Sequence, residues 1–193
     1  MRTMKAALYQ GDRKLEIKDI AVPEVGPGEV LTRVRAEGVC GSDLLLWWDK
    51  AEPEVIPGGH EVAGEIVEVG QGVDKGRIGE RVAIDILGFG LNCGSCFYCR
   101  QGQPVQCRDK KPDTGGGYAQ YIKRNAAGCF PIHDNMNWEE AALVEPLAVS
   151  VHACRRGNLE GGETVLVLGA GNIGQTAVAA ARAMGAGKVM VTA

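Results

Sequence analysis

The apolar residues of the first two thirds of the chain occur in short runs that glycine and proline interrupt. Five of these runs have the length and the β-branched content of strands: residues 5–8, 15–17, 30–36, 61–69 and 81–87. Turn-forming residues separate them, and short strands at this spacing are typical of a compact barrel or sandwich. The pattern therefore predicts an all-β region from residue 4 to about residue 132.

The pattern becomes helical at Asn137. Asn137 and Glu140 have the spacing of an N-cap and N3 pair, which predicts a helix that begins at Trp138. A second helix is expected over residues 147–156, before a turn rich in glycine.

The remaining residues predict one β-α-β unit. A strand at 164–168 leads into a glycine loop at 169–174, an alanine-rich helix follows as far as Met184, and a second strand covers residues 188–192. We expect a new domain to begin near residue 157. Because a parallel sheet of only two strands cannot bury both of its faces, this second domain is expected to be incomplete.

Composition places the chain among ordinary globular proteins. Of its 193 residues, 45% are hydrophobic and 23% are charged, and the formal net charge is -3. This charge gives no bulk reason to expect attraction to phosphate backbones or anionic lipid. We therefore expect no nucleic-acid partner and no membrane partner.

The pattern of apolar segments and cysteines favours a cytoplasmic location for the protein. Residues 1–14 contain no apolar segment long enough for a signal peptide, and the longest apolar stretches fall short of a bilayer span. The chain has seven cysteines, an odd number, and four of them lie between residues 93 and 107. This crowding suits metal ligation in a reducing compartment better than a disulfide framework.

The four crowded cysteines carry the strongest chemical signal. Cys93, Cys96, Cys99 and Cys107 have the spacing C-x2-C-x2-C-x7-C, which allows four thiolates to converge on one zinc ion. Such a site has no open coordination position, so its role is structural. Two alternatives are an iron–sulfur cluster, whose ferredoxin spacing ends C-x3-C-P, and paired disulfides.

A second set of candidate ligands is dispersed along the sequence. Cys40, His60, Glu61 and Glu145 supply the sulfur, nitrogen and oxygen atoms that zinc accepts at a catalytic site with one open position. Taken singly, a cysteine such as Cys40 is more often a small buried residue than a ligand, and a pair such as His60-Glu61 is more often a surface polar pair. Glu145 lies within an apolar run, where a carboxylate needs a metal, a cation or hydrogen bonds near it.

Two neighbours of Cys40 are candidates for catalysis. A zinc ion lowers the pKa of a bound hydroxyl toward neutrality, and an ionised alcohol is the species that releases hydride. Ser42 could then carry the proton away from the substrate hydroxyl, and Asp43 could orient His60 through its second ring nitrogen.

The glycine loop has the G-x-G-x-x-G pattern of dinucleotide-binding sites, and it stands between a predicted strand and a predicted helix, as that fingerprint requires. Pyrophosphate would lie at the start of the helix, close to Gly169 and Gly171, while Gly174 would allow the helix to pack on the strand. Asn172 and Ile173 complete the predicted binding loop. The alternative is an ordinary β-α turn.

The phosphate state of the cofactor is open. The acidic residue that binds the adenosine ribose is expected about 20 residues beyond the loop, at the end of the second strand. Ala193 stands there. Either the acidic residue follows this segment, or the site prefers NADP, or coenzyme binding is impaired.

Taken in order, these motifs resemble those of zinc-dependent medium-chain alcohol and polyol dehydrogenases, over essentially the whole chain. The motifs are Cys40-Gly41-Ser42-Asp43, Gly59-His60-Glu61, Gly79-Glu80-Arg81-Val82, the four cysteines, Glu145-Pro146-Leu147 and the glycine loop. Within that family, residues 139–157 are most similar to sorbitol dehydrogenases and related polyol dehydrogenases.

The resemblance implies a GroES-like, β-rich catalytic domain over residues 1–156, with a structural zinc lobe at 93–107. It also implies the start of a Rossmann coenzyme domain over residues 157–193. Cys40, His60 and Glu61 would hold a catalytic zinc, with Glu145 as a direct or water-mediated fourth partner. Each chain would then hold two zinc ions and use NAD or NADP.

The resemblance further implies oxidation of a secondary alcohol, such as the polyols sorbitol or xylitol, by a parent protein that forms a homodimer or homotetramer. Threonine dehydrogenases and simple alcohol dehydrogenases are near neighbours of the same family. A different class of function is a truncated, non-catalytic zinc-binding module, because family members continue through the rest of the Rossmann sheet. The resemblance therefore leaves open whether this fragment alone is active.

Overall fold

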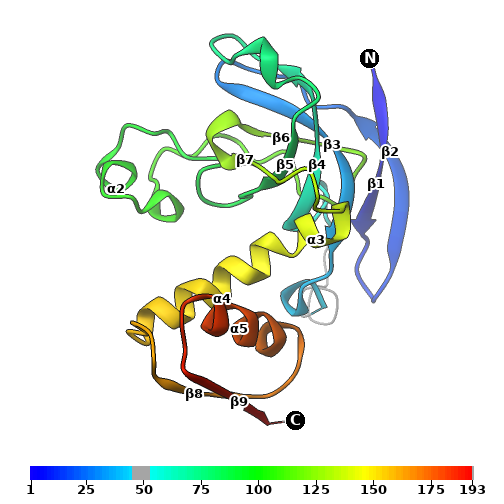
Figure 1. Cartoon of the computed structure of the whole chain (residues 1–193). Helices are drawn as coiled ribbons and strands as arrows, with labels where there is room; N and C mark the ends of the chain where they lie inside the picture. Colours follow the sequence, from blue (N-terminus) through cyan, green and yellow to red (C-terminus); the bar gives the residue numbers. More distant parts are fainter. Residues whose placement is uncertain (45–52, 193) are drawn as a thin grey trace. The chain divides into compact units, whose positions relative to one another are not determined.

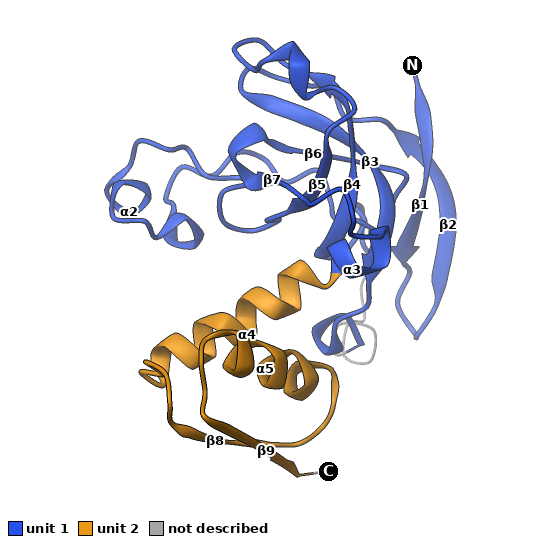
Figure 2. Cartoon of the chain, viewed as in Figure 1, with its two compact units in different colours: residues 1–142 blue, residues 143–193 orange. Residues whose placement is uncertain are grey.

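The computed structural model describes residues 1–44 and 53–192. The chain divides into two compact units, residues 1–142 and residues 143–193 (Figure 2). The strands are β1 (Thr3–Tyr9), β2 (Leu15–Ala21), β3 (Glu29–Gly38), β4 (Glu61–Val69), β5 (Arg81–Ile84), β6 (Tyr121–Asn125), β7 (Cys129–Pro131), β8 (Thr164–Leu168) and β9 (Lys188–Thr192). The α-helices are α2 (Phe97–Arg100), α3 (Trp138–Ala142), α4 (Val144–Arg156) and α5 (Asn172–Ala183), and the 3-10 helices are η1 (Lys75–Arg77), η2 (Pro104–Gln106) and η3 (Ala126–Gly128).

The first unit is built on an antiparallel sheet of five strands in the order β6-β3-β4-β5-β7. These strands are labelled in Figure 1. Its central pair is β3 and β4, whose register shifts twice, between Leu31 and Thr32 and between Val34 and Ala36. Such irregularities bend a strand and increase its twist. The hairpin of β1 and β2 joins this unit through a bridge between Ala6 and Ala119. The fold confirms the β-rich architecture that the sequence predicts for this part of the chain.

The largest buried cluster of the first unit is built on the strands of this sheet. It consists of branched aliphatic side chains that alternate along the strands, together with one cysteine: Val30, Val62, Ile66, Val82, Ile84, Ile86, Ile122 and Cys129. Burying one such aliphatic side chain contributes about 1.5–3 kcal/mol relative to leaving it exposed. The stiff frame that results fixes the ends of β3 and β4, where the candidate ligands lie.

Helix α3 begins as the sequence predicts. Asn137 Oδ1 accepts a hydrogen bond from the backbone N–H of Glu140 (2.7 Å), and Glu140 Oε2 accepts one from the N–H of Asn137 (2.9 Å). This reciprocal pair satisfies two backbone donors that a helix start otherwise leaves unpaired. Ala141 and Ala142 of α3 are buried in a cluster with Ala63 of β4.

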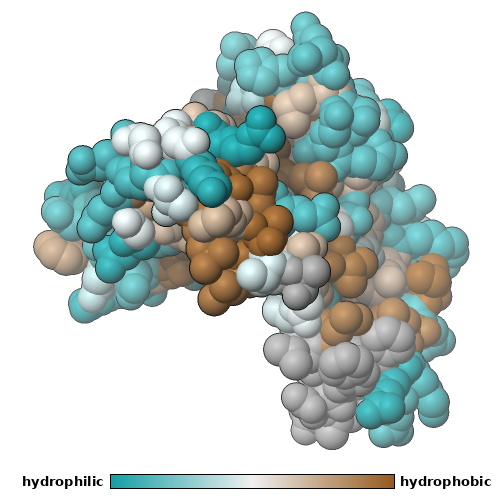
Figure 3. Space-filling model, turned by 60° about the horizontal axis from the view of Figure 1, so that its bottom comes forward, coloured by the Kyte–Doolittle hydropathy of each residue, from teal (hydrophilic) through white to brown (hydrophobic). Residues whose placement is uncertain are grey.

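The second unit contains α4, β8, α5 and β9. Strands β8 and β9 pair in parallel, and α4 packs on α5, where the buried Ser150 hydroxyl lies 2.8 Å from the Thr176 hydroxyl. Leu166 and Leu168 of β8 and Val191 of β9 remain exposed. Exposed apolar side chains also gather in a brown area of the face that Figure 3 shows.

The boundary between the two compact units falls between Ala142 and Leu143 of the chain, because α4 packs with α5. The predicted division into a catalytic domain of residues 1–156 and a coenzyme domain of residues 157–193 stays a prediction. Among the described residues, no helix is both long enough and apolar enough to cross a membrane.

Candidate metal centres and glycine loop

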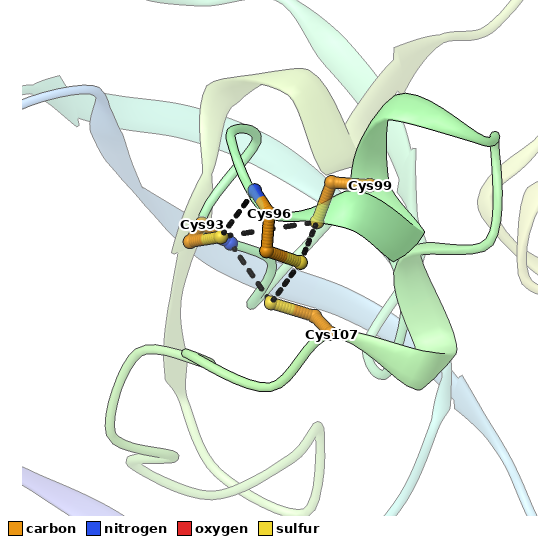
Figure 4. A group of neighbouring side chains, drawn as sticks. All are labelled: Cys93, Cys96, Cys99 and Cys107. Carbon is orange, nitrogen blue, oxygen red and sulfur yellow. Dashed lines mark hydrogen bonds between the residues drawn. The ribbon is translucent and has the colours of Figure 1, made fainter.

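Four cysteine side chains converge in the lobe of residues 93–107 (Figure 4). Cys96 Sγ lies 3.5 Å from Cys99 Sγ and 3.9 Å from Cys107 Sγ, and Cys93 Sγ lies 3.9 Å from Cys99 Sγ. Tetrahedral zinc with Zn–S distances of about 2.3 Å places its sulfur ligands about 3.8 Å apart. A four-iron cluster would hold each sulfur on a separate iron atom, farther from the next. The spacing of the four sulfurs therefore fits one tetrahedral ion.

The backbone of the lobe is arranged to favour thiolates. The N–H of Cys96 points to Cys93 Sγ at 3.4 Å, and the N–H of Cys93 points to Cys107 Sγ at 3.3 Å. Hydrogen bonds from the backbone at Ser95 and Cys96 lower the pKa of Cys93 to about 6. Desolvation and the neighbouring thiols raise the pKa of Cys99 to about 11. Thiolates so close together repel one another, and a bound divalent cation removes that penalty.

The lobe is tied to the sheet through two asparagines. The side-chain amide of Asn125, at the end of β6, donates to the carbonyl oxygens of Phe89 (3.1 Å) and Asn92 (2.8 Å). The amide of Asn92 in turn points to Cys99 Sγ at 3.6 Å. The position of the cysteine lobe is therefore set from the end of β6, an edge strand of the five-stranded sheet.

Cys40, His60 and Glu61 form a second group in the first unit. One ligand atom from each lies within 4.8 Å of the others. His60 and Glu61 stand at the start of β4, and Cys40 follows the end of β3, so the antiparallel pairing of these strands brings the three together. Glu61 is 3% exposed and lies opposite Gly38, where any Cβ would collide with the Glu61 carboxylate.

Asp43 connects the cysteine and histidine ligands. Its Oδ2 accepts hydrogen bonds from the backbone N–H of Cys40 (3.0 Å) and from the hydroxyl of Tyr118 (2.8 Å). Its Oδ1 lies 3.6 Å from His60 Nδ1, so that ring nitrogen faces a carboxylate. A carboxylate in this position fixes the orientation and tautomer of a histidine that binds a metal through its other nitrogen.

Glu37 is a third acidic residue beside this group. Its Oε1 accepts a hydrogen bond from the backbone N–H of Glu61 at 3.1 Å. Desolvation, opposed by hydrogen bonds from the backbone and reinforced by the charges of Asp43 and Glu61, raises the pKa of Glu37 to about 8. The donor set of sulfur, imidazole and carboxylate, together with the negative charge of Asp43 and Glu61 that raises this pKa, suits a divalent cation.

Ser42 and Glu145 are the two remaining residues of the predicted catalytic site. Ser42 is exposed in the helical turn of residues 41–44, next to Cys40. Glu145 is half-buried in the first turn of α4, in the second compact unit. A carboxylate is favoured there by the helix dipole. The roles of Ser42 in proton transfer and of Glu145 in metal binding stay predictions.

The glycine loop joins β8 to α5, in the strand-loop-helix context that the sequence predicts. Gly169 has φ +100°, a left-handed conformation that favours glycine, and Gly171 is the N-cap of α5. A Cβ on Gly174 would collide with the carbonyl oxygen of Gly169, whereas one on Gly171 would meet open space. Asn172 and Ile173, at the exposed start of α5, leave backbone N–H groups available to an anion. Ala193 lies outside the described residues.

Comparison with known protein families gives one match to the central part of the chain. Residues 26–134 match the family model of the alcohol dehydrogenase GroES-like domain. The chain belongs to this family. The matched range contains both cysteine-bearing groups described above, which places them within the GroES-like domain.

Relatives of this GroES-like chain are named dehydrogenases. It is 40% identical over 202 residues to sorbitol dehydrogenase of Bacillus subtilis (strain 168). That alignment covers 99% of this chain and 56% of the relative. It is 38% identical over 196 residues to sorbitol dehydrogenase of Homo sapiens, which covers 96% of this chain and 54% of that protein. The predicted likeness to sorbitol dehydrogenases is thus confirmed, and the chain spans about half the length of these relatives.

A solved structure supports the same fold. Acetophenone reductase from Geotrichum candidum NBRC 4597, in complex with NAD, aligns with a TM-score of 0.83 and 31% identity. The alignment covers 99% of this chain and 58% of that one.

Sequence reasoning missed two residues of this GroES-like site, Glu37 and Tyr118. Glu37 stands in the stretch Ala36-Glu37-Gly38-Val39, where an isolated acid among small and apolar residues could have been detected by the argument applied to Glu145. Tyr118 has no comparable local signal, because its partner Asp43 lies 75 positions away in the sequence.

Proposed function

We propose that this chain is the metal-binding part, with the start of the coenzyme-binding part, of a zinc-dependent NAD(P)-linked dehydrogenase that oxidises a secondary alcohol. The observation that carries the proposal is the convergence of Cys40, His60 and Glu61, which offer one sulfur, one nitrogen and one oxygen ligand within 4.8 Å of one another. Mixed ligands of this kind are typical of catalytic zinc, whereas all-thiolate sets are typical of structural zinc.

The two metal groups would have separate roles. Cys93, Cys96, Cys99 and Cys107 would hold a structural zinc, and Cys40, His60 and Glu61 would hold a catalytic zinc with Glu145 as a direct or water-mediated partner. This assignment gives two zinc ions per chain. When bound, the catalytic ion supplies Lewis acidity, which lowers the pKa of an alcohol hydroxyl.

The protein groups around that ion would orient the reactants. Asp43 holds the Cys40 backbone and faces His60, so it fixes two of the three ligands. Ser42, exposed beside Cys40, would accept the hydroxyl proton of the substrate and pass it toward solvent. The hydride would pass to the nicotinamide ring of the coenzyme. The pyrophosphate of that coenzyme would bind at the glycine loop of residues 169–174.

The substrate we propose is a polyol such as sorbitol or xylitol. The support comes from the relatives named sorbitol dehydrogenase, with identities of 40% and 38%. Threonine and simple alcohols are the alternatives within the family. We also propose a cytoplasmic location, in keeping with the seven free thiols, and a parent protein that forms a homodimer or homotetramer.

Two measurements on the chain test the proposal. Elemental analysis is expected to give two zinc ions per chain, and a fluorescence titration with NADH and with NADPH is expected to show binding of one of them. A screen of polyols, threonine and simple alcohols with both coenzymes, on the full-length parent, then identifies the substrate.

The results separate the candidates. Two zinc ions without nucleotide binding would favour a non-catalytic zinc-binding module. A single zinc ion, retained by the four cysteines alone, would exclude the catalytic site and with it the dehydrogenase.

A further inference from the structure

Glu37 occupies a confined position between two segments that are far apart in sequence. Its carboxyl group faces Gly59 on one side and Gly117 on the other, and a Cβ at either glycine would collide with it. Gly59 has φ +88°, a conformation that glycine adopts readily. These two glycines therefore leave the space that the Glu37 side chain fills.

The two segments are also joined by backbone hydrogen bonds. Gly117 N–H donates to the Gly59 carbonyl (3.2 Å), and Tyr118 N–H donates to the Gly58 carbonyl (3.0 Å). Glu37 lies beside these two hydrogen bonds and accepts a further one from the backbone N–H of Glu61. The turn that carries His60 and Glu61 is thus held from both sides.

The hydrogen bond between Glu37 and the Glu61 N–H acts at the start of β4, next to both ligands of the turn. Glu37 stands on β3, across the sheet from Val62 of β4, while the adjacent pair is Gly38 with Glu61. Its Oε1 reaches back along β4 to the first N–H of that strand. The other oxygen, Oε2, is buried and has no hydrogen-bond partner among the described residues. Through its contacts with the backbone of Glu61 and His60, this side chain acts on the turn that carries both ligands.

From this geometry we infer that Glu37 is a positioning residue, whose Oε1 fixes the Glu61 backbone so that His60 and Glu61 present their ligand atoms to the same ion as Cys40. The inference rests on the proposed catalytic metal site. Groups that hold metal ligands from behind typically change metal affinity by about 10–100-fold when they are altered.

Two substitutions at position 37 distinguish the effect of side-chain length from the effect of charge. Glu37→Asp keeps the carboxylate but withdraws it by one methylene from the Glu61 N–H, and Glu37→Gln keeps an acceptor oxygen at full reach without a charge. We expect Glu37→Asp to weaken the binding of one of the two zinc ions by about tenfold or more. The affinity of Glu37→Gln is expected to stay close to that of the unaltered chain.

Glu29 supplies a matched control at the other end of the same strand. It is 6% exposed, and it too accepts a hydrogen bond from a backbone N–H, that of Gly26, at 2.8 Å. Glu29→Asp and Glu29→Gln alter a buried carboxyl of β3 away from the metal groups. Neither is expected to change zinc affinity, although both are expected to lower thermal stability.

Zinc retained per chain is measured after equilibration with a competing chelator at increasing concentrations. Equal affinity of Glu37→Asp and the unaltered chain would overturn the inference. If Glu37→Gln weakens zinc binding as much as Glu37→Asp does, the effect belongs to charge and the inference is wrong. If Glu29→Asp weakens zinc binding equally, the effect belongs to general destabilisation and the inference is again wrong. If the unaltered chain itself binds only one zinc ion, the proposed function fails and this inference with it.

Discussion

The hydroxyl of Tyr118 donates a 2.8 Å hydrogen bond to Oδ2 of Asp43, which is the same oxygen that accepts the backbone N–H of Cys40. The contact links the segment before β6 to the turn that carries the cysteine ligand. Desolvation and the hydrogen bond to Asp43 raise the pKa of Tyr118, so this hydroxyl keeps its proton and acts as a donor at all physiological pH values.

Tyr118→Phe tests this link. The substitution removes one donor to a carboxylate, and hydrogen bonds to charged groups contribute about 1.5–3 kcal/mol. We expect a loss of unfolding free energy at the low end of that range, together with weaker binding of one zinc ion. Chemical denaturation and zinc competition measure the two effects.

Tyr121→Phe is the matched control. It retains the ring that Arg2 and Arg33 contact and removes only the hydroxyl. If both phenylalanine variants change zinc affinity to the same extent, the contact between Tyr118 and Asp43 is not what holds the ligand turn.

Cys96→Ser tests the independence of the two metal groups. Cys96 Sγ lies within 3.9 Å of both Cys99 Sγ and Cys107 Sγ, and a serine hydroxyl is a poor substitute for a thiolate on zinc. We expect the variant to hold one zinc ion per chain instead of two, because the Cys40 group is built on β3 and β4. Elemental analysis gives the count.

Cys154→Ser provides the comparison, because Cys154 lies on α4 and belongs to neither metal group. This variant is expected to keep both ions. Loss of both ions from Cys96→Ser would show that the lobe and the Cys40 group are coupled.

Glu29 gives the chain a predictable dependence on pH. Although burial raises the pKa of Glu29, the hydrogen bond from Gly26 and the ammonium groups of Lys123 and Lys111 lower it below 4.5 on balance. Because the folded-state pKa is the lower one, the stabilisation is present above pH 4.5 and is lost as pH falls through the folded-state value. Glu29→Gln removes this contribution.

We therefore expect Glu29→Gln to unfold more easily than the unaltered chain near neutral pH, by about 1–3 kcal/mol. The difference should narrow as the pH falls below 4.5, the ordinary value for a glutamate. Urea denaturation of both proteins over this range measures it. A difference that is constant with pH would show that the carboxylate charge contributes nothing.

Local sequence signals predict much of this fold because glycine and proline mark many of its boundaries. Strands β4, β8 and β9 have the predicted bounds. Strand β5 ends at Ile84, three residues before its predicted end, because the Asp85 side chain accepts the N–H groups of Leu87, Gly88 and Phe89 and forms a turn.

Helix α4 begins at Val144 and not at the predicted residue 147, since Pro146 lies in its first turn, where a missing N–H breaks no helical hydrogen bond. The short strands β6 and β7 were not among the predicted runs. Both are defined mainly by pairing with β3 and β5, which no local pattern reveals.

The ligands of both metal groups could be identified from residue type and spacing, but the residues that orient them could not. Asn92 has a local clue, since it precedes Cys93 directly, yet its anchor Asn125 lies 33 positions away. Glu37 contacts Glu61 across 24 positions. Contacts of this kind arise from the register of the sheet, which a single sequence specifies only through the packing of the whole core.

The glycine loop allows structural and binding roles to be separated within one motif. Gly174 packs against the carbonyl oxygen of Gly169, so a methyl group there forces the start of α5 away from β8. We expect Gly174→Ala to destabilise the second unit by about 1–3 kcal/mol. Hydrogen exchange at the amides of α5 reports this change directly.

Gly171→Ala is the informative partner of that variant. Its φ of -71° suits alanine, and the added methyl meets open space, so the fold is expected to keep its stability. Pyrophosphate bound at the start of α5 would approach the backbone at this position closely, and the methyl would stand in its way. NADH or NADPH binding is therefore expected to weaken in Gly171→Ala while its hydrogen exchange stays unchanged. Coenzyme affinity that is unaffected by this methyl would show that the loop is an ordinary β-α turn and not the coenzyme site.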